Sequence, residues 1–93
     1  MAEIFFRPRA FRAAETLLSK AEQEKLNSLL NQLRNGTFPP NAKKLQDIKH
    51  GYRLRIGRWR VLFSLISQTE KIEVVDIFME KGGQDYRRRQ KIF

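Results

Sequence analysis

Five basic residues stand within twelve positions in the middle of the chain, and no acidic residue separates them: Lys49, Arg53, Arg55, Arg58 and Arg60. Apolar residues at 52, 54 and 56 alternate with Arg53 and Arg55, which indicates a β-strand with both arginines on one face. Gly57 and Arg58 predict a short turn. Arg60 on the returning strand shares a face with Arg58, and it joins Arg53 and Arg55 if the turn sets that register. Guanidinium groups bind phosphates in a bidentate manner, so this hairpin predicts a phosphate-binding surface.

The alternative is a solvated outer face of a half-buried sheet. Such faces usually mix positive and negative charges, and this segment does not. A phosphate-binding role is therefore the favoured interpretation of the hairpin.

Residue types limit the chemistry that this surface can support. The chain has no cysteine and one histidine, His50, which excludes disulfides, thiolate metal sites and histidine cages. Acidic residues are scattered, so no paired carboxylates for two-metal hydrolysis stand out. No cofactor is expected. RNA permits cleavage without a metal, because its own 2′-hydroxyl can attack the phosphate while cations stabilise the developing charge.

A second basic cluster follows Tyr86 near the end of the chain: Arg87, Arg88, Arg89 and Lys91. Tyr86 can stack on a base or orient a hydroxyl, or it can pack a terminal helix on the sheet. Trp59 is assigned to the core because it alternates with Val61 and Phe63. His50 is assigned to a solvated loop, although histidine side chains in general are suited to proton transfer near neutral pH.

Two helices are expected to precede the hairpin. Residues 2–6 form a short strand, and Pro8 suits the first turn of a helix. The apolar stripe of this first helix runs through Phe11, Ala14, Leu17, Leu18 and Ala21. Ser19 and Glu22 match a capping box that begins the second helix. Its stripe is Leu26, Leu29, Leu30 and Leu33, at the i, i+3, i+4, i+7 spacing of a helix.

The later part of the chain predicts a sheet. Residues 37–51 form a basic connector, strands cover 52–56, 59–66 and 72–78, and residues 84–92 form a short helix. The fold class is α+β, in the order β-α-α-β-β-β-α, with a small and mainly antiparallel sheet.

Size and charge fit one compact domain spanning 1–93. The 93 residues carry 19 Lys and Arg against 10 Asp and Glu, a net charge of +9, which predicts an acidic partner. Because no segment is long and apolar enough for a membrane and no signal peptide is evident, a cytoplasmic protein with no membrane contact is expected.

The chain resembles the RelE/ParE superfamily of bacterial toxin–antitoxin toxins. The likeness rests on the helix pair, the segment KKLQDIKHGYRLRIGRWRVLF, the strand IEVVDIF and the Tyr86-Arg87 tail. It covers nearly the whole chain. In the RelE branch it implies ribosome-dependent mRNA cleavage without a metal or small-molecule cofactor, and neutralisation by a cognate antitoxin.

The resemblance also assigns residues. The implied catalytic set is Arg53, Arg55, Arg60, Lys81 and Tyr86, and the implied RNA-binding set is Lys43, Lys44, Lys49, Arg58, Arg87, Arg88 and Arg89. Arginine stays protonated and is a poor base. The general base is therefore left open among Tyr86, Lys81, His50, an acid such as Glu80, and a ribosomal group.

Two other functions are compatible with these residues. One is a ParE-type poison of DNA gyrase, which has the same scaffold and no enzymatic activity. The other is a non-toxic RNA- or ribosome-binding module, which charge alone would support. Tyr86 and its basic neighbours favour RelE-like cleavage.

Overall fold

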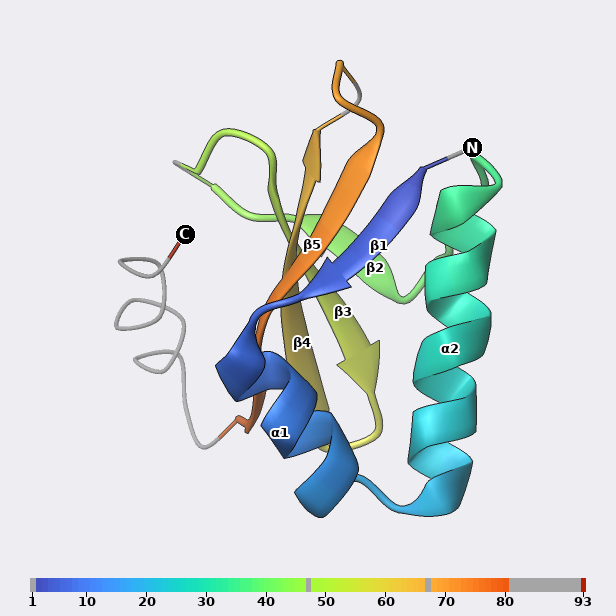
Figure 1. Cartoon of the computed structure of the whole chain (residues 1–93), viewed down its shortest axis with the longest axis vertical. Helices are drawn as coiled ribbons and strands as arrows, with labels where there is room; N and C mark the ends of the chain where they lie inside the picture. The colour runs from blue at the N-terminus through green and yellow to red at the C-terminus, as the bar shows by residue number, and fades with distance from the viewer. Residues whose placement is uncertain (1, 47, 67, 81–92) are drawn as a thin grey trace.

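The computed structural model describes residues 2–46, 48–66, 68–80 and 93, and in it five strands form one sheet beside two helices (Figure 1). The strands are β1 (Glu3–Phe6), β2 (Ala42–Lys44), β3 (Gly51–Ile56), β4 (Trp59–Ile66) and β5 (Lys71–Met79). The helices are α1 (Pro8–Thr16) and α2 (Lys20–Arg34). The predicted α+β class with a mainly antiparallel sheet is confirmed.

Strand order in the sheet is β1-β5-β4-β3-β2. All neighbours are antiparallel except β1, which runs parallel to β5. The tight turn at residues 57–58 joins β3 to β4, and Gly57 takes a positive φ of 57° there, which costs glycine little. This hairpin therefore fixes the register in which the predicted arginines meet.

Local signals in the sequence explain how α2 begins. The Glu22 backbone N–H donates to the Ser19 hydroxyl at 3.1 Å, and the Ser19 N–H donates to the Glu22 carboxylate at 2.8 Å. The predicted capping box is thus confirmed. The hydrogen bond that the Ser19 N–H donates to the Glu22 carboxylate lowers the pKa of Glu22 below its ordinary value of 4.5. The positive charge of Arg58 lowers it further.

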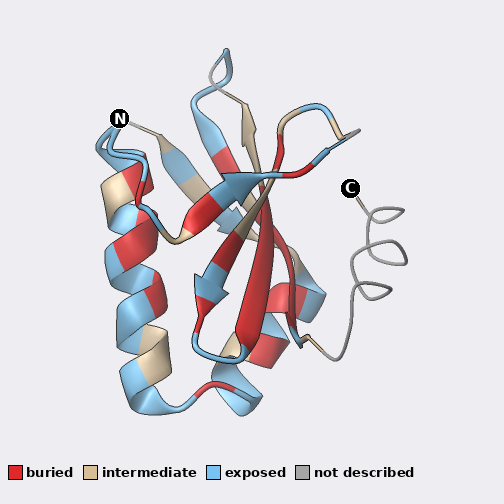
Figure 2. Ribbon diagram, turned by 180° about the vertical axis from the view of Figure 1, so that it is seen from behind, coloured by how far each residue is buried: buried red, intermediate tan, exposed pale blue. Residues whose placement is uncertain are grey.

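The buried residues gather on the central strands of the sheet and along α2 (Figure 2), and most of them form one cluster on the helix-covered face. The leucine stripe of α2 packs there against the inward residues of β3, β4 and β5, of which Leu54, Val61 and Phe63 are fully buried. Trp59 belongs to this cluster, as predicted. The Phe63 ring also stacks on Tyr52 with centroids 5.5 Å apart.

The opposite face holds a smaller apolar cluster: Leu45, Leu62, Val75 and Phe78, with Ile48 and Phe93 packed against it. Val75 reaches this face through a β-bulge, since β4 pairs Leu62 with Asp76 but Phe63 with Val74. No helix belongs to the described part of this cluster. We call this side of the sheet the open face.

Three predictions about the elements need correction or fall outside the description. The predicted stripe of the first helix was only partly right: Leu18 is buried and Ala14 packs against the core, but Phe11 and Leu17 are exposed while Ala10 and Ala13 are buried. The connector 37–51 contains a strand, β2, which pairs with β3. The predicted helix at 84–92 lies outside the described residues.

Neither α1 nor α2 is long and apolar enough to cross a membrane.

Candidate functional site

Three arginines of the hairpin, Arg53, Arg55 and Arg60, gather on the open face. Arg53 and Arg55 point there because Tyr52, Leu54 and Ile56 pack on the helix side. Arg60 lies directly opposite Arg55 across β3 and β4, so the turn does set the register that unites the three arginines. Lys43 on β2 joins them, since it lies directly opposite Arg53.

Two like-charge pairs therefore stand in adjacent rows of the sheet: Lys43 opposite Arg53, and Arg55 opposite Arg60. Residues directly opposite one another have Cβ atoms about 4.5–5.5 Å apart, and like charges at that distance destabilise a sheet. Such an arrangement gains nothing for folding. It creates a positive field suited to an anion that bridges the rows.

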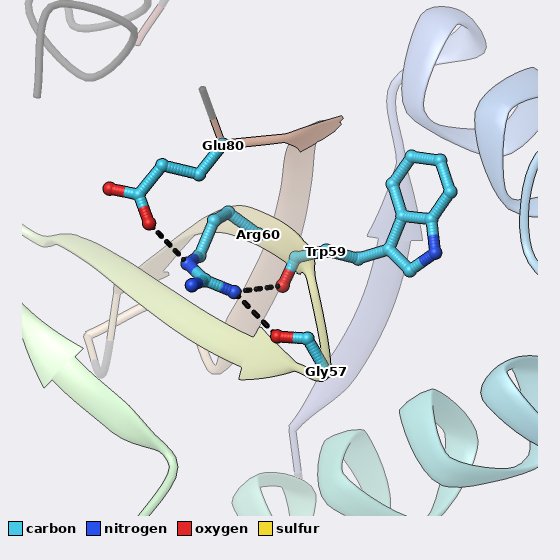
Figure 3. Close-up of polar contacts among 4 residues, drawn as sticks. All are labelled: Gly57, Trp59, Arg60 and Glu80. Atoms are coloured by element: carbon cyan, nitrogen blue, oxygen red, sulfur yellow. Dashed lines mark hydrogen bonds and ion pairs between the residues drawn. The ribbon is translucent and has the colours of Figure 1, made fainter. Parts of the chain in front are cut away.

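Arg60 is the one cation of this group that the fold encloses (Figure 3). Its Nε donates to a Glu80 carboxylate oxygen at 2.9 Å, and its Nη1 donates to the carbonyls of Gly57 and Trp59 at 2.8 and 3.0 Å. The Arg60 side chain is 9% exposed and that of Glu80 is 25% exposed. These bonds fix the Arg60 guanidinium at the turn and hold the Glu80 carboxylate beside it.

Arg55 is placed quite differently from its neighbour. Its backbone is bound to Asn41, through the Arg55 N–H to the Asn41 carbonyl and from the Asn41 amide to the Arg55 carbonyl. The residue is exposed, and within the described residues its guanidinium has no bonded partner. Arg55 is therefore the cation on this face that is best placed to meet a ligand from solvent.

The other predicted RNA-binding residues do not all belong to this face. Lys44 lies opposite Tyr52, and its ammonium donates to the carbonyls of Leu45 and Ile48. Arg58 lies over the Trp59 ring at 5.7 Å, on the helix side, so the expectation that it shares a face with Arg60 was wrong. Lys49 is exposed in the turn before β3.

Several assigned positions lie outside the described residues: Lys81, Tyr86, Arg87, Arg88 and Arg89. His50 is described and has a positive φ of 65° in the turn that precedes β3, so its assignment to a loop is confirmed. His50 therefore lies next to the first residue of β3, at the end of that strand farthest from Arg55.

The sequence did not reveal the pairing of Arg60 with Glu80. The two residues are twenty positions apart, and their contact depends on the register of β4 against β5 and on the end of β5 at Met79. The alternation of Phe78 and Glu80 with Met79 is the signal that places Glu80 on the open face. In the described part of the chain, no three His, Asp or Glu side chains form a group suited to a metal ion.

Comparison with known proteins gives structural matches alone. No family model matches the chain. No curated protein shows significant sequence similarity to it.

Solved structures that resemble it are toxins and their complexes. The isolated Escherichia coli RelE toxin superposes with a TM-score of 0.74 at 16% identity, over 100% of both chains. RelE in the intact E. coli RelBE toxin–antitoxin complex gives 0.70 at 18% identity, over 88% of this chain and 100% of that one. The Methanococcus jannaschii RelB–RelE complex gives 0.69 at 15% identity, over 88% and 96%. The chain therefore has the α+β fold of the RelE toxins.

Proposed function

We propose that the protein is the toxin of a toxin–antitoxin system and that it cleaves mRNA on the ribosome. The observation that carries the proposal is the pair of like-charge rows on the open face, Lys43–Arg53 and Arg55–Arg60. Repulsion of this kind is relieved when a phosphate binds between the rows. The RelE fold supports the choice of message as the source of that phosphate.

The proposed reaction is an attack of the RNA 2′-hydroxyl on the adjacent phosphate. The bond from O2′ to phosphorus forms, the bond to O5′ breaks, and a 2′,3′-cyclic phosphate results. Arg55 and Arg53 contact the phosphate and stabilise the charge of the transition state. Tyr86 and Lys81 keep the roles that the family resemblance implies, base stacking and phosphate contact.

The proposal includes an acidic or amphipathic antitoxin and the ribosome as partners. A net charge of +9 in 93 residues speeds association with such partners and strengthens it at low salt. Lys43 and Lys49 extend the basic surface beyond the hairpin and would track the RNA backbone.

Message cleavage in a translating extract tests the proposal. Full-length protein should cut ribosome-bound message at defined positions within codons. Arg55→Ala should lower the cleavage rate by about 100-fold, the size of effect expected when a charge-stabilising group is removed. Its thermal stability should not fall, because the Arg55 guanidinium supports no other described residue.

Arg12→Ala is the matched control, because Arg12 is also an exposed arginine but lies on α1. It should retain cleavage within about twofold, since an exposed charge away from the site contributes little. Intact message together with gyrase-dependent DNA damage would point instead to a ParE-type poison. Binding to any RNA without cleavage or growth arrest would point to a general RNA-binding module.

A further inference from the structure

We propose that Glu80 is the general base of the cleavage, the group that takes the proton from the attacking 2′-hydroxyl. This inference rests on the proposed function and adds a residue to its machinery. The carboxylate of Glu80 lies on the open face and accepts a bond from Arg60, which is directly opposite Arg55 in the sheet.

The reaction needs a base that accepts the proton of the attacking 2′-hydroxyl. The arginines of the site do not provide one. Arginine keeps its proton at ordinary pH, so Arg53, Arg55 and Arg60 supply positive charge to the site but do not accept a proton from the hydroxyl. Gly51, at the start of β3, is four residues from Arg55, or about 13 Å at 3.3 Å per residue, and His50 lies in the turn beyond it. A base must come within about 2.6–3.2 Å of the hydroxyl oxygen, so His50 does not serve a phosphate bound at Arg55.

Arg60 holds the Glu80 carboxylate in a defined position. Arg60 is fixed by the Gly57 and Trp59 carbonyls at the β3–β4 turn, and its Nε holds one Glu80 oxygen. The other Glu80 oxygen points away from Arg60 in Figure 3 and has no partner among the described residues. Arg60 thus orients a carboxylate that keeps one oxygen available to solvent.

Arg60 on β4 lies between Arg55 on β3 and Glu80 directly after β5. Arg55 lies directly across from Arg60, so a phosphate held by the Arg55 guanidinium sits next to the Arg60–Glu80 pair. Among the described residues, the charged groups that face Glu80 from neighbouring elements are Arg60 on β4 and, behind it, Arg55 on β3.

The proposed step balances in atoms and protons. Glu80 takes the proton of the 2′-hydroxyl as the O2′–P bond forms. The P–O5′ bond breaks, and O5′ takes a proton from water. Glu80 then returns its proton to the solvent. No oxidant, reductant or further co-reactant is consumed.

Single-turnover cleavage on message-programmed ribosomes tests this assignment with Glu80→Gln. Glutamine can still accept the Arg60 Nε bond, but it is not basic. Cleavage should slow by about 100-fold or more, the usual contribution of a general base. Binding to ribosomes whose message carries a 2′-O-methyl group at the scissile nucleotide should weaken by less than about threefold, because Arg55 is untouched.

The pH profile separates a base from a merely structural group. Between about pH 6 and 8 the wild-type rate should be flat, whereas the Glu80→Gln rate should rise about tenfold per pH unit as hydroxide takes over. Glu80→Asp, which keeps a carboxylate on a shorter side chain, should recover part of the rate and the flat profile. Glu73→Gln removes the same charge from β5, where Glu73 pairs with Arg7, and should behave as wild type.

Three results would overturn the assignment. Glu80→Gln could cleave within about threefold of Glu73→Gln, it could lose binding by the same factor as cleavage, or it could keep the flat profile. If Glu80→Gln fails to fold, the rate and profile of Glu80→Asp decide in its place. Absence of cleavage by the wild-type protein would instead reject the proposed function, and the base with it.

Discussion

On the helix-covered face of the sheet, nearly every inward side chain is apolar and belongs to one large cluster. The open face holds a small apolar cluster surrounded by cations: Lys43, Arg53, Arg55 and Arg60. Apolar burial stabilises a fold in proportion to the area removed from water, whereas like charges side by side oppose it. The contrast indicates that one face carries the stability of the domain and the other carries a charge pattern that stability alone would not retain.

Matched leucine deletions give the largest expected difference between the faces. Leu54 faces the helices and Leu62 the open face, and both are fully buried on neighbouring strands. Leu54→Ala should lower the free energy of unfolding by about 4 kcal/mol and Leu62→Ala by about 2.5 kcal/mol, because the smaller cluster can collapse into its cavity. Urea denaturation measures both. A larger loss for Leu62→Ala would break the comparison.

Loss of the cap on α2 should have a smaller effect on the helix-covered side. Ser19→Ala removes the hydroxyl that accepts the Glu22 N–H, and it should cost about 1 kcal/mol in thermal or urea unfolding. An unchanged midpoint would show that packing of the leucine stripe alone holds the start of α2.

The same cap predicts a pH dependence through Glu22. Its folded-state pKa lies below the ordinary value of 4.5, so its contribution is complete above that pH. The contribution disappears as the pH falls through the lower folded-state value. Wild type should therefore be more stable than Glu22→Gln at neutral pH, and their unfolding curves should converge in acid. A difference that persists in acid would assign the effect to shape rather than charge.

The smallest expected effect is a gain in stability on the open face. Lys43→Glu replaces a like-charge pair with Arg53 by an opposite-charge pair and should stabilise the protein by about 0.5 kcal/mol. RNA binding and message cleavage should fall, since a cation becomes an anion at the site. Lys25→Glu, on the exposed side of α2, controls for the change of net charge. If Lys43→Glu kept full cleavage, the charge of this row would have no part in function.

Periodic and local signals predicted much of the fold. The leucine stripe and the Ser19–Glu22 box identified α2, and the alternation at 52–56 identified β3 and its arginine face. The predicted stripe of α1 was right for Ala14 and Leu18 but wrong for Phe11 and Leu17, because Ala10 and Ala13 are buried in place of those larger residues. Close approach of a helix to a sheet favours small side chains, and hydrophobicity alone does not reveal that preference. Strand β2 was missed because it has only three residues, two of them lysines, and its pairing with β3 defines it.

By itself, the sequence determined the chemical inventory: abundant guanidinium groups, one histidine, no cysteine, and alternation that places Arg53 and Arg55 on one face. Side-chain periodicity is a local property, so these conclusions needed no distant contact. Tertiary structure decided which cations share that face with a carboxylate. It moved Arg58 to the helix side, enclosed Arg60, left Arg55 exposed and brought Glu80 to Arg60 across twenty residues. Those outcomes depend on strand register and on where each strand ends, which are set by packing of the whole sheet.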